Sequence, residues 1–288
     1  MEKKQRIQRK SMRNRLERRI TWVLLLPLHL LILLPPPQEK CTIAPIMKGV
    51  LICGGTGSRL KPLTDVTNKS LLPVYDRPLI HEPLDVMLRA GIKEIAVVTG
   101  TEHMDQIAKY LGSGSTFGCS FAFVVQEKPG GIAQALALAE EFVDGDALCA
   151  ILGDNIFFDD LTPAITSFEN GGHVFLKEVP DPERFGVAEI DGKTDGAFRV
   201  TGIEEKPAQP KSNYAVTGCY VYDNTCFDII RNMKPSARGE LEITDVSREY
   251  LKQGNLRATV LKDDWIDAGT FESLFKAAEL VRSHRRRS

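Results

Sequence analysis

Short apolar runs alternate with amphipathic segments through the first half of the chain. The apolar runs have the length and the flanking turn residues of buried strands, and we expect strands at residues 49–53, 94–99, 120–126 and 147–152. The segments between and after them are expected to form helices near residues 80–90, 103–111, 131–143 and 161–168. Strands that alternate with helices across short connections are typical of a parallel sheet covered on both faces.

The pattern changes in the second half of the chain. From His173 to Tyr222, strands and turns follow one another without an intervening helix, which predicts a β-rich region. Three further helices are expected near residues 224–232, 243–252 and 270–282. The sequence therefore predicts an α/β fold of the three-layer α/β/α Rossmann-like type, with a mixed, mostly parallel central sheet and an inserted β-rich region.

The N-terminal segment differs from the rest of the chain. A basic run precedes an apolar run at residues 20–34, which is shorter than the ~20 residues that a membrane-spanning helix needs. Two interpretations stay open: residues 1–46 are upstream sequence before a true start at Met47, or they form an uncleaved membrane anchor. A cleaved signal peptide fits poorly, because no small-residue cleavage pattern follows the apolar run. We expect residues 47–288 to form one domain.

Composition and charge narrow the class of protein. The 288 residues are 43% hydrophobic and 26% charged, which is typical of a globular protein with a sizeable core. Residues 1–46 hold 10 Lys/Arg and 3 Asp/Glu, which leaves 27 and 35 for the rest, so the body is acidic and a nucleic-acid ligand is not expected. The 6 cysteines include no CxxC pair. A reduced cytoplasmic location is predicted, or a membrane-associated one if residues 20–34 are a real anchor.

A glycine-rich loop follows the first predicted strand. Gly54, Gly55 and Gly57 let backbone N–H groups approach an anion closely, and Arg59 and Lys69 add two positive charges. The Gly-Lys-Ser/Thr ending of a Walker A loop and the third glycine of a dinucleotide-binding fingerprint are both missing. The loop therefore predicts a polyphosphate site of another kind.

Polar side chains follow the ends of other predicted strands. Gln126 ends the strand at residues 120–126, and Asp154 follows the strand at residues 147–152. The carboxyl ends of parallel strands lie at one edge of a sheet, where ligands bind. A carboxylate there suits Mg²⁺, although an aspartate after a strand is also a common helix cap.

Eight sequence blocks in the same order link the chain to a known family: MKGVLICGGTGSRL, NKSLLPVYDRPLI, QEKPGGIAQAL, LGDNIF, DPERFGVAEI, EEKPAQPKSNYAVTGCYVYD, RGELEITDV and WIDAGT. Across residues 47–281 the chain resembles the sugar-nucleotide pyrophosphorylases, and within them the branch that transfers a thymidylyl group to glucose 1-phosphate. The resemblance implies a nucleotidyltransferase fold whose β-rich region binds the sugar. It implies dTTP and glucose 1-phosphate as substrates, Mg²⁺ as cofactor, and a homo-oligomer.

The product of such an enzyme, dTDP-glucose, would serve deoxysugar synthesis of the dTDP-rhamnose type and surface polysaccharide synthesis. Bacterial relatives often continue beyond the last helix into a regulatory segment. The present chain stops at Ser288, so we expect it to lack the end-product regulatory site of that segment.

The resemblance also implies roles for particular residues. The expected catalytic residues are Arg59 on the departing phosphates, Lys69 on the reacting phosphates and Lys206 on the sugar phosphate. The expected nucleotide-binding residues are Gly54, Gly55, Gly57, Gln126 and Gly131. The expected sugar-binding residues are Asn155, Gly186, Glu205, Val216 and Tyr220, and the expected metal ligands are Asp154 and Asp267. The nucleophile, a phosphate oxygen, is already anionic, so catalysis needs positioning and charge neutralisation rather than a general base.

Alternatives remain for both the activity and the residues. The same reaction with UTP, another nucleotide or another sugar fits the sequence, and so does a catalytically silent sensor of nucleotide sugars. By composition alone the segment around Lys206 is a solvated charged turn, and Gln126 is an ordinary polar strand end. The RGELEITD segment predicts a turn and a helix capped by Thr244 or Asp245, and no chemistry is assigned to it.

Overall fold

The computed structural model describes residues 47–194 and 197–286. The N-terminal extension predicted at residues 1–46, including the apolar run at residues 20–34, lies outside the described residues. Within the described ranges, no helix is long and apolar enough to cross a membrane.

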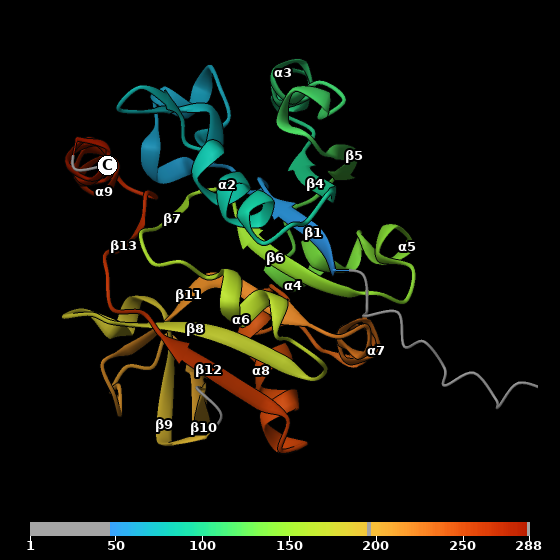
Figure 1. The fold of residues 1–288 in the computed structure, drawn as a ribbon, viewed down its shortest axis with the longest axis vertical. Helices are drawn as coiled ribbons and strands as arrows, with labels where there is room; N and C mark the ends of the chain where they lie inside the picture. The colour runs from blue at the N-terminus through green and yellow to red at the C-terminus, as the bar shows by residue number, and fades with distance from the viewer. Residues whose placement is uncertain (1–46, 195–196, 287–288) are drawn as a thin grey trace, which may run out of the picture. The chain divides into compact units, whose positions relative to one another are not determined.

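The largest element is a nine-stranded sheet with the strand order β5-β4-β1-β6-β11-β8-β12-β10-β9 (Figure 1). Its first four strands in this order are parallel to one another, and we call them the parallel half. They are β5 (Ser120–Gln126), β4 (Glu94–Gly100), β1 (Met47–Ile52) and β6 (Ala147–Leu152). Each lies where the sequence predicted a strand, because a nearly continuous apolar run suits a strand that is buried on both faces.

The other five strands form what we call the antiparallel half. They are β11 (Tyr214–Tyr222), β8 (Gly172–Glu178), β12 (Leu256–Val260), β10 (Ala197–Glu205) and β9 (Gly186–Thr194). Strand β11 joins the two halves by pairing antiparallel with β6 and with β8, while β12 runs parallel to β8. The predicted β-rich region is therefore part of the same mixed sheet.

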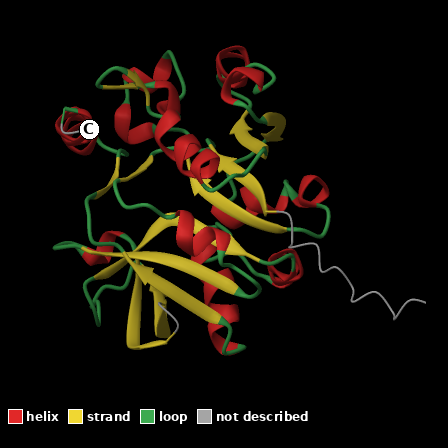
Figure 2. Ribbon diagram, viewed as in Figure 1, coloured by secondary structure: helices red, strands yellow, loops and turns green. Residues whose placement is uncertain are grey.

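Helices cover the sheet, and the last described helix lies apart from it (Figure 2). They are α2 (His81–Arg89), α3 (Met104–Leu111), α4 (Ile132–Ala137), α5 (Glu140–Val143), α6 (Thr162–Thr166), α7 (Thr225–Asn232), α8 (Ile243–Lys252) and α9 (Phe271–Arg285). The single helix expected at residues 131–143 is divided into α4 and α5. The N–H of Ala139 donates to the carbonyl of Leu136, three residues back (3.0 Å), and this tighter turn separates the two helices.

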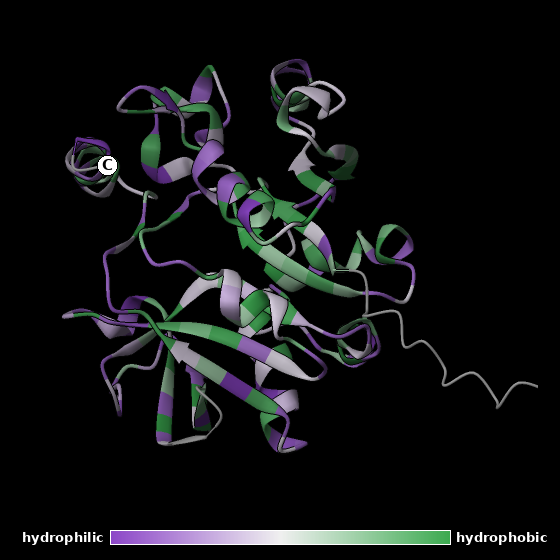
Figure 3. Cartoon of the chain, in the orientation of Figure 1, coloured by the Kyte–Doolittle hydropathy of each residue, from purple (hydrophilic) through white to green (hydrophobic). Residues whose placement is uncertain are grey.

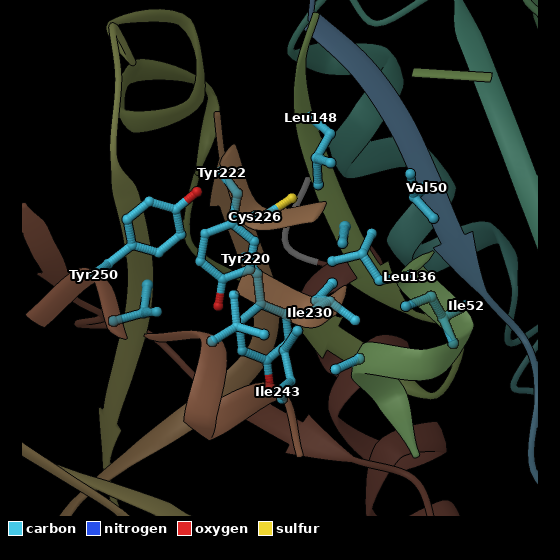
Figure 4. Close-up of a cluster of buried hydrophobic side chains, with 14 of the residues drawn as sticks. Val50, Ile52, Leu136, Leu148, Tyr220, Tyr222, Cys226, Ile230, Ile243 and Tyr250 are labelled. Atoms are coloured by element: carbon cyan, nitrogen blue, oxygen red, sulfur yellow. The ribbon is translucent and has the colours of Figure 1, made fainter. Parts of the chain in front are cut away.

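The two faces of the sheet bury separate clusters of apolar side chains. Alternate residues of β1 point in opposite directions, so that Val50 and Ile52 join one cluster and Leu51 joins the other. The first cluster also contains side chains from α4, α7 and α8 and the stacked rings of Tyr220 and Tyr222 (Figure 4). In Figure 3, β1 and β6 are mostly green, as expected for strands covered on both faces, whereas β8, β9 and β12 also carry purple and white residues.

A short two-stranded ribbon lies beside the main sheet. Strand β7 (Asn155–Phe157) pairs antiparallel with β13 (Trp265–Asp267), and Asp267 lies opposite Asn155. These three-residue strands were not predicted from the sequence. The ribbon packs on a small third core with α9 and the hairpin of β2 (Pro73–Val74) and β3 (Arg77–Pro78). It brings a late part of the chain back to the end of β6.

Candidate active site

A hollow of about 650 Å³ lies where the two halves of the sheet meet. With one exception, the residues predicted to form the site line this hollow: Gly54, Gly55, Arg59, Lys69, Gln126, Gly131, Asp154, Asn155, Gly186, Glu205, Lys206, Val216, Tyr220 and Asp267. The exception, Gly57, lines a smaller adjoining hollow of about 160 Å³, which shares Gly55, Lys69 and Gln126 with the larger one. The structure therefore brings together residues that are more than two hundred positions apart.

The glycine-rich loop continues from the end of β1. Gly55 and Gly57 have positive φ angles of 93° and 59°, which residues other than glycine rarely adopt. The hydroxyl of Thr64 donates to the carbonyl of Gly57 (2.9 Å) and fixes the far end of the loop. Arg59 follows in a short 3₁₀ turn and stays exposed to solvent.

The side chain of Arg59 reaches the loop after β13. A Cβ built on Gly269 would lie 2.7 Å from Nη2 of Arg59 and 2.9 Å from Oδ1 of Asp267. Both groups therefore lie close to the backbone of Gly269, and a side chain at this position would displace one of them. The next residue, Thr270, forms a capping box with Ser273 that starts α9 and holds this loop in place.

Lys69, in the 3₁₀ turn Lys69–Leu71, forms a buried ion pair with Asp154, which follows the end of β6. Asn68 fixes the backbone beside Lys69, since its side chain accepts from the N–H of Ser70 (2.9 Å) and donates to the carbonyl of Cys53 (3.0 Å). Burial alone opposes the charge on Asp154, but the charge and hydrogen bond of Lys69 outweigh it and hold the pKa of Asp154 below its ordinary value. Both partners are therefore ionised at neutral pH.

Asp267 lies next to this ion pair, but one oxygen of its carboxylate has no hydrogen-bond partner among the described residues. This oxygen, Oδ1, is buried. Burial and the nearby charge of Asp154 raise the pKa of Asp267 to about 6. The backbone connects the two residues, because the N–H of Ala268 donates to the carbonyl of Asp154 (2.9 Å). An unsatisfied buried carboxylate beside a second carboxylate is a suitable place for a cation.

Asn155, which was expected to bind the sugar, uses its side chain inside the protein. Its Oδ1 accepts from the N–H of Gly218 (2.9 Å) and from the indole N–H of Trp265 (2.8 Å), and its Nδ2 donates to Oδ1 of Asp154 (3.0 Å). A Cβ on Gly218 would lie 2.6 Å from the Asn155 amide, so a glycine is needed there. The geometry makes Asn155 and Trp265 orient Asp154. The sequence did not single out Trp265, although it begins the WIDAGT block.

Glu205 and Lys206 lie at the end of β10 on the opposite side of the hollow. Glu205 Oε2 accepts from the hydroxyl of Thr244 (2.6 Å), while Oε1 lies 3.3 Å from Nη2 of Arg238 and 3.7 Å from Nζ of Lys206. Lys206 has a positive φ of 44°, and its N–H donates to the carbonyl of Phe185 (3.0 Å). The charged turn is therefore held in a defined shape at the rim of the hollow.

Two residues here were missed by the sequence analysis. Arg238 contacts Glu205 and also pairs with Glu242 (2.8 Å), and its hydrogen bond to Glu242 raises the pKa of Arg238. Thr244 lies in the first turn of α8, but its hydroxyl binds Glu205 and does not cap the helix, so the predicted cap was wrong. The RGELEITD block was the signal, because both residues belong to it.

The remaining walls of the hollow beside β10 and β11 are apolar. Tyr220 and Val216 from β11 are buried, and Gly186 leaves room because a Cβ there would lie 2.9 Å from the Thr244 hydroxyl. Phe185 packs edge-on against Trp265, with ring centroids 5.3 Å apart. Aromatic and small residues next to a few charges are typical of a pocket that binds a small molecule.

Comparison with known proteins agrees with this arrangement. The nucleotidyl transferase family model matches residues 48–284. A glucose-1-phosphate thymidylyltransferase from Neisseria meningitidis is 46% identical over 243 residues, which are 82% of this chain and 83% of the relative. The corresponding protein from Mycobacterium tuberculosis is 41% identical over 246 residues and 84% of each chain.

Solved structures share the fold. A Bacillus anthracis protein described as a glucose-1-phosphate thymidylyltransferase, solved in complex with a sucrose, superposes with a TM-score of 0.77 at 51% identity, covering 82% of this chain and 95% of that one. A UDP-glucose pyrophosphorylase solved with UDP-glucose has a TM-score of 0.73 at 24% identity, covering 83% of this chain and 99% of that one, and this similarity shows the fold alone. The predicted α/β fold class is confirmed, and the chain belongs to the nucleotidyl transferase family, among relatives that are glucose-1-phosphate thymidylyltransferases.

Proposed function

We propose that the protein transfers a thymidylyl group from dTTP to glucose 1-phosphate, giving dTDP-glucose and pyrophosphate. The observation that carries this proposal is that one hollow holds two sets of charged residues. On one side lie the glycine-rich loop, Arg59 and Lys69, and the carboxylates of Asp154 and Asp267. On the other side, Glu205, Lys206 and Arg238 lie beside an apolar pocket. Two phosphorylated substrates fit such a site, one on each side. A catalytically silent nucleotide-sugar sensor has little need for the complete set of carboxylates and cations: Arg59, Lys69, Asp154, Lys206 and Asp267.

The glycine-rich loop and Arg59 bind the triphosphate. Backbone N–H groups of Gly54, Gly55 and Gly57 face the phosphates, and the exposed guanidinium of Arg59 neutralises the β- and γ-phosphates that leave as pyrophosphate. Arg59 and Asp267 both lie close to Gly269, so the guanidinium is on the side of the hollow where we place the departing pyrophosphate. Charge neutralisation of this kind is worth several kcal/mol in a phosphate transfer.

Asp154 and Asp267 fit a divalent metal ion of the Mg²⁺ type. Mg²⁺ takes oxygen ligands and is often held by one or two carboxylates together with substrate phosphates. The buried, unpartnered Oδ1 of Asp267 is the feature that favours this assignment. Among the described residues, no group of three or more His, Cys, Asp or Glu side chains could form a closed metal cage, so the remaining positions would fall to substrate oxygens and water. Bound there, the ion would neutralise the triphosphate.

The reacting groups need only be positioned. A phosphate oxygen of glucose 1-phosphate attacks the α-phosphorus of dTTP, the bond to the bridging oxygen breaks, and pyrophosphate takes the electron pair. No proton has to be removed, because the nucleophile is already ionised. Lys69 neutralises the reacting phosphates from one side, and Lys206 with Arg238 holds the sugar phosphate from the other.

Glu205 binds hydroxyl groups of the sugar. Thr244 and Arg238 hold its carboxylate from two sides, so that it faces the hollow with its remaining lone pairs. Tyr220 and Val216 form the apolar surface against which the sugar ring packs. A homo-oligomer and a cytoplasmic location remain predictions.

The test is pyrophosphate release by the full chain with glucose 1-phosphate and Mg²⁺, comparing dTTP, UTP, ATP, CTP and GTP. Release led by dTTP supports the proposal. Faster release with another nucleotide would mean that the enzyme makes a different nucleotide sugar. No release from folded protein with any of the nucleotides would contradict the proposed function.

A further inference from the structure

The amide of Gln126 has a fixed orientation at the end of β5. Its Nε2 donates to Oε1 of Gln134 (2.5 Å) and makes a longer contact with the carbonyl of Gly131 (3.4 Å). These two contacts use both hydrogens of the NH₂ group. The carbonyl oxygen, Oε1, points the other way, toward the glycine-rich loop, where a Cβ on Gly54 would lie only 2.5 Å from it.

This orientation cannot be reversed without a penalty. If the amide were flipped, Oε1 of Gln126 would face the carbonyl oxygen of Gly131, which can only accept hydrogen bonds. It would also face Oε1 of Gln134 unless that amide flipped as well. Gln126 is only 5% exposed, so the lost hydrogen bonds would not be replaced by water.

Two glycines shape the turn between the two glutamines. A Cβ on Gly130 would lie 3.2–3.3 Å from the Gln134 side chain, which folds back over it. Gly131 has a φ of 101°, and a Cβ there would lie 2.4 Å from the carbonyl of Leu241. Gln134 itself is in the first turn of α4 and does not line either hollow, whereas Gln126 lines both.

We propose that Gln134 is a positioning residue that determines base specificity: it turns the Gln126 amide so that a hydrogen-bond acceptor, and not a donor, faces the base. The inference rests on the proposed function and on the nucleotide-binding roles that the resemblance implies for Gln126 and Gly131, beside which we place the base of the nucleotide. A pyrimidine with an imide N–H, such as thymine or uracil, donates to this oxygen. Cytosine presents a lone pair at the same ring position and is repelled.

Substitutions of Gln134 with opposite hydrogen-bonding character test the inference. Gln134→Glu keeps an acceptor toward Nε2 of Gln126, whereas Gln134→Lys supplies a donor and favours the flipped amide. Both residues are good helix formers of similar length, so their effects on α4 are matched. The readout is the ratio of kcat/KM for dTTP to that for dCTP, two substrates with the same deoxyribose, together with the KM for glucose 1-phosphate.

We expect Gln134→Glu to keep the dTTP/dCTP ratio and Gln134→Lys to lower it about tenfold, a typical change for one reversed hydrogen bond. The KM for glucose 1-phosphate should stay the same in both variants, because only the base contact is altered. A changed KM would indicate a general disturbance of the site. Equal dTTP/dCTP ratios in the two variants would overturn the inference. Gln126→Met separates this failure from that of the proposed base site: if this variant lowers the ratio and Gln134→Lys does not, the base site stands and only the role of Gln134 is lost. If neither variant changes the ratio, the base does not bind at Gln126.

Discussion

The parallel and antiparallel halves of the sheet place charge at the site in different ways. Beside the parallel half, Lys69 and Asp154 are 18% and 7% exposed and pair with each other. Beside the antiparallel half, Lys206 and Arg238 are 45% and 44% exposed and share the carboxylate of Glu205. Charges interact strongly when water is excluded and weakly when it is not. We call the surroundings of Lys69 and Asp154 the phosphate side, and those of Lys206 and Arg238 the sugar side, after the ligands proposed for them. The buried pair on the phosphate side should therefore be sensitive to the loss of either charge, while the sugar side should tolerate the loss of one.

The largest effect is expected for Asp154→Asn on the phosphate side. The variant removes one negative charge from the buried pair with Lys69 and one proposed metal ligand, while the shape of the side chain is kept. We expect turnover to fall about 10³-fold, or ~4 kcal/mol, as for other preorganised charges at a transition state. Pyrophosphate release at saturating substrates measures this loss.

The matched control for this variant is Asp263→Asn, which neutralises an exposed aspartate outside the hollow. It should keep normal turnover, and circular dichroism should show a folded protein for both variants. Turnover of Asp154→Asn close to that of the control would contradict both the metal assignment and the contrast between the two halves.

This contrast could be predicted only in part from the sequence. Strands β5 and β6 have the predicted bounds, because a long apolar run between turns leaves few alternatives. Strands β7 and β13 were missed because three residues give no periodic pattern, and they are held by pairing with a segment about 110 positions away. The proximity of Asp154 and Asp267 came from the resemblance to known enzymes, since local sequence does not encode it.

The partners of the site residues were the least predictable feature. The sequence indicated Glu205 and Gln126, but not that Thr244 and Gln134 would hold their side chains. Both contacts depend on glycines that let the backbone pass closely, Gly186 in the first case and Gly130 in the second. Which side chain fills the space above a glycine follows from tertiary packing, and neither spacing nor composition reveals it.

The second effect concerns stability and involves a histidine that is buried away from the site and stays uncharged there. His173 in β8 is 8% exposed, and burial, assisted by Arg257, lowers its pKa from 6.5 to about 4. Between pH 4 and 6.5 the unfolded chain binds the proton more readily than the folded one. Stability from this group is therefore fully present above pH 6.5 and is lost as the pH falls toward 4, by at most about 3 kcal/mol.

Urea denaturation at pH 7.5 and pH 4.5 measures this loss. His173→Gln removes the titrating group, so its stability should change less between the two pH values than that of the unmodified protein. An equal change in both would mean that carboxylates alone cause the pH dependence. A smaller change in the variant would sharpen the comparison, because it would mean that a charge is also costly in the antiparallel half at positions that water does not reach.

A smaller effect is expected for Lys206→Met on the sugar side. Arg238 remains close to Glu205 and can still bind the sugar phosphate, so we expect the KM for glucose 1-phosphate to rise about tenfold while the KM for dTTP stays the same. Adding Arg238→Met should reduce kcat/KM by more than the sum of the two single effects in free energy, because each cation substitutes for the other. If Lys206→Met reduced turnover as much as Asp154→Asn, the proposed difference between the two halves would be wrong.

The smallest effect is expected in the packing that supports the sugar side. The hydroxyl groups of Tyr222 in β11 and Ser247 in α8 share a hydrogen bond of 2.6 Å, and neither residue is exposed (Figure 4 shows the tyrosine). Tyr222→Phe should lower the free energy of unfolding by about 1 kcal/mol, because it leaves the Ser247 hydroxyl without a partner. Combining it with Ser247→Ala should cost less than the sum of the single changes, since no buried polar group is then left unpaired. Helix α8 also carries Thr244, which holds Glu205, so the KM for glucose 1-phosphate reports whether the helix has moved. An unchanged KM together with the lower stability would show that the site tolerates small changes in its supporting core, whereas a raised KM would extend the site to the packing of this helix.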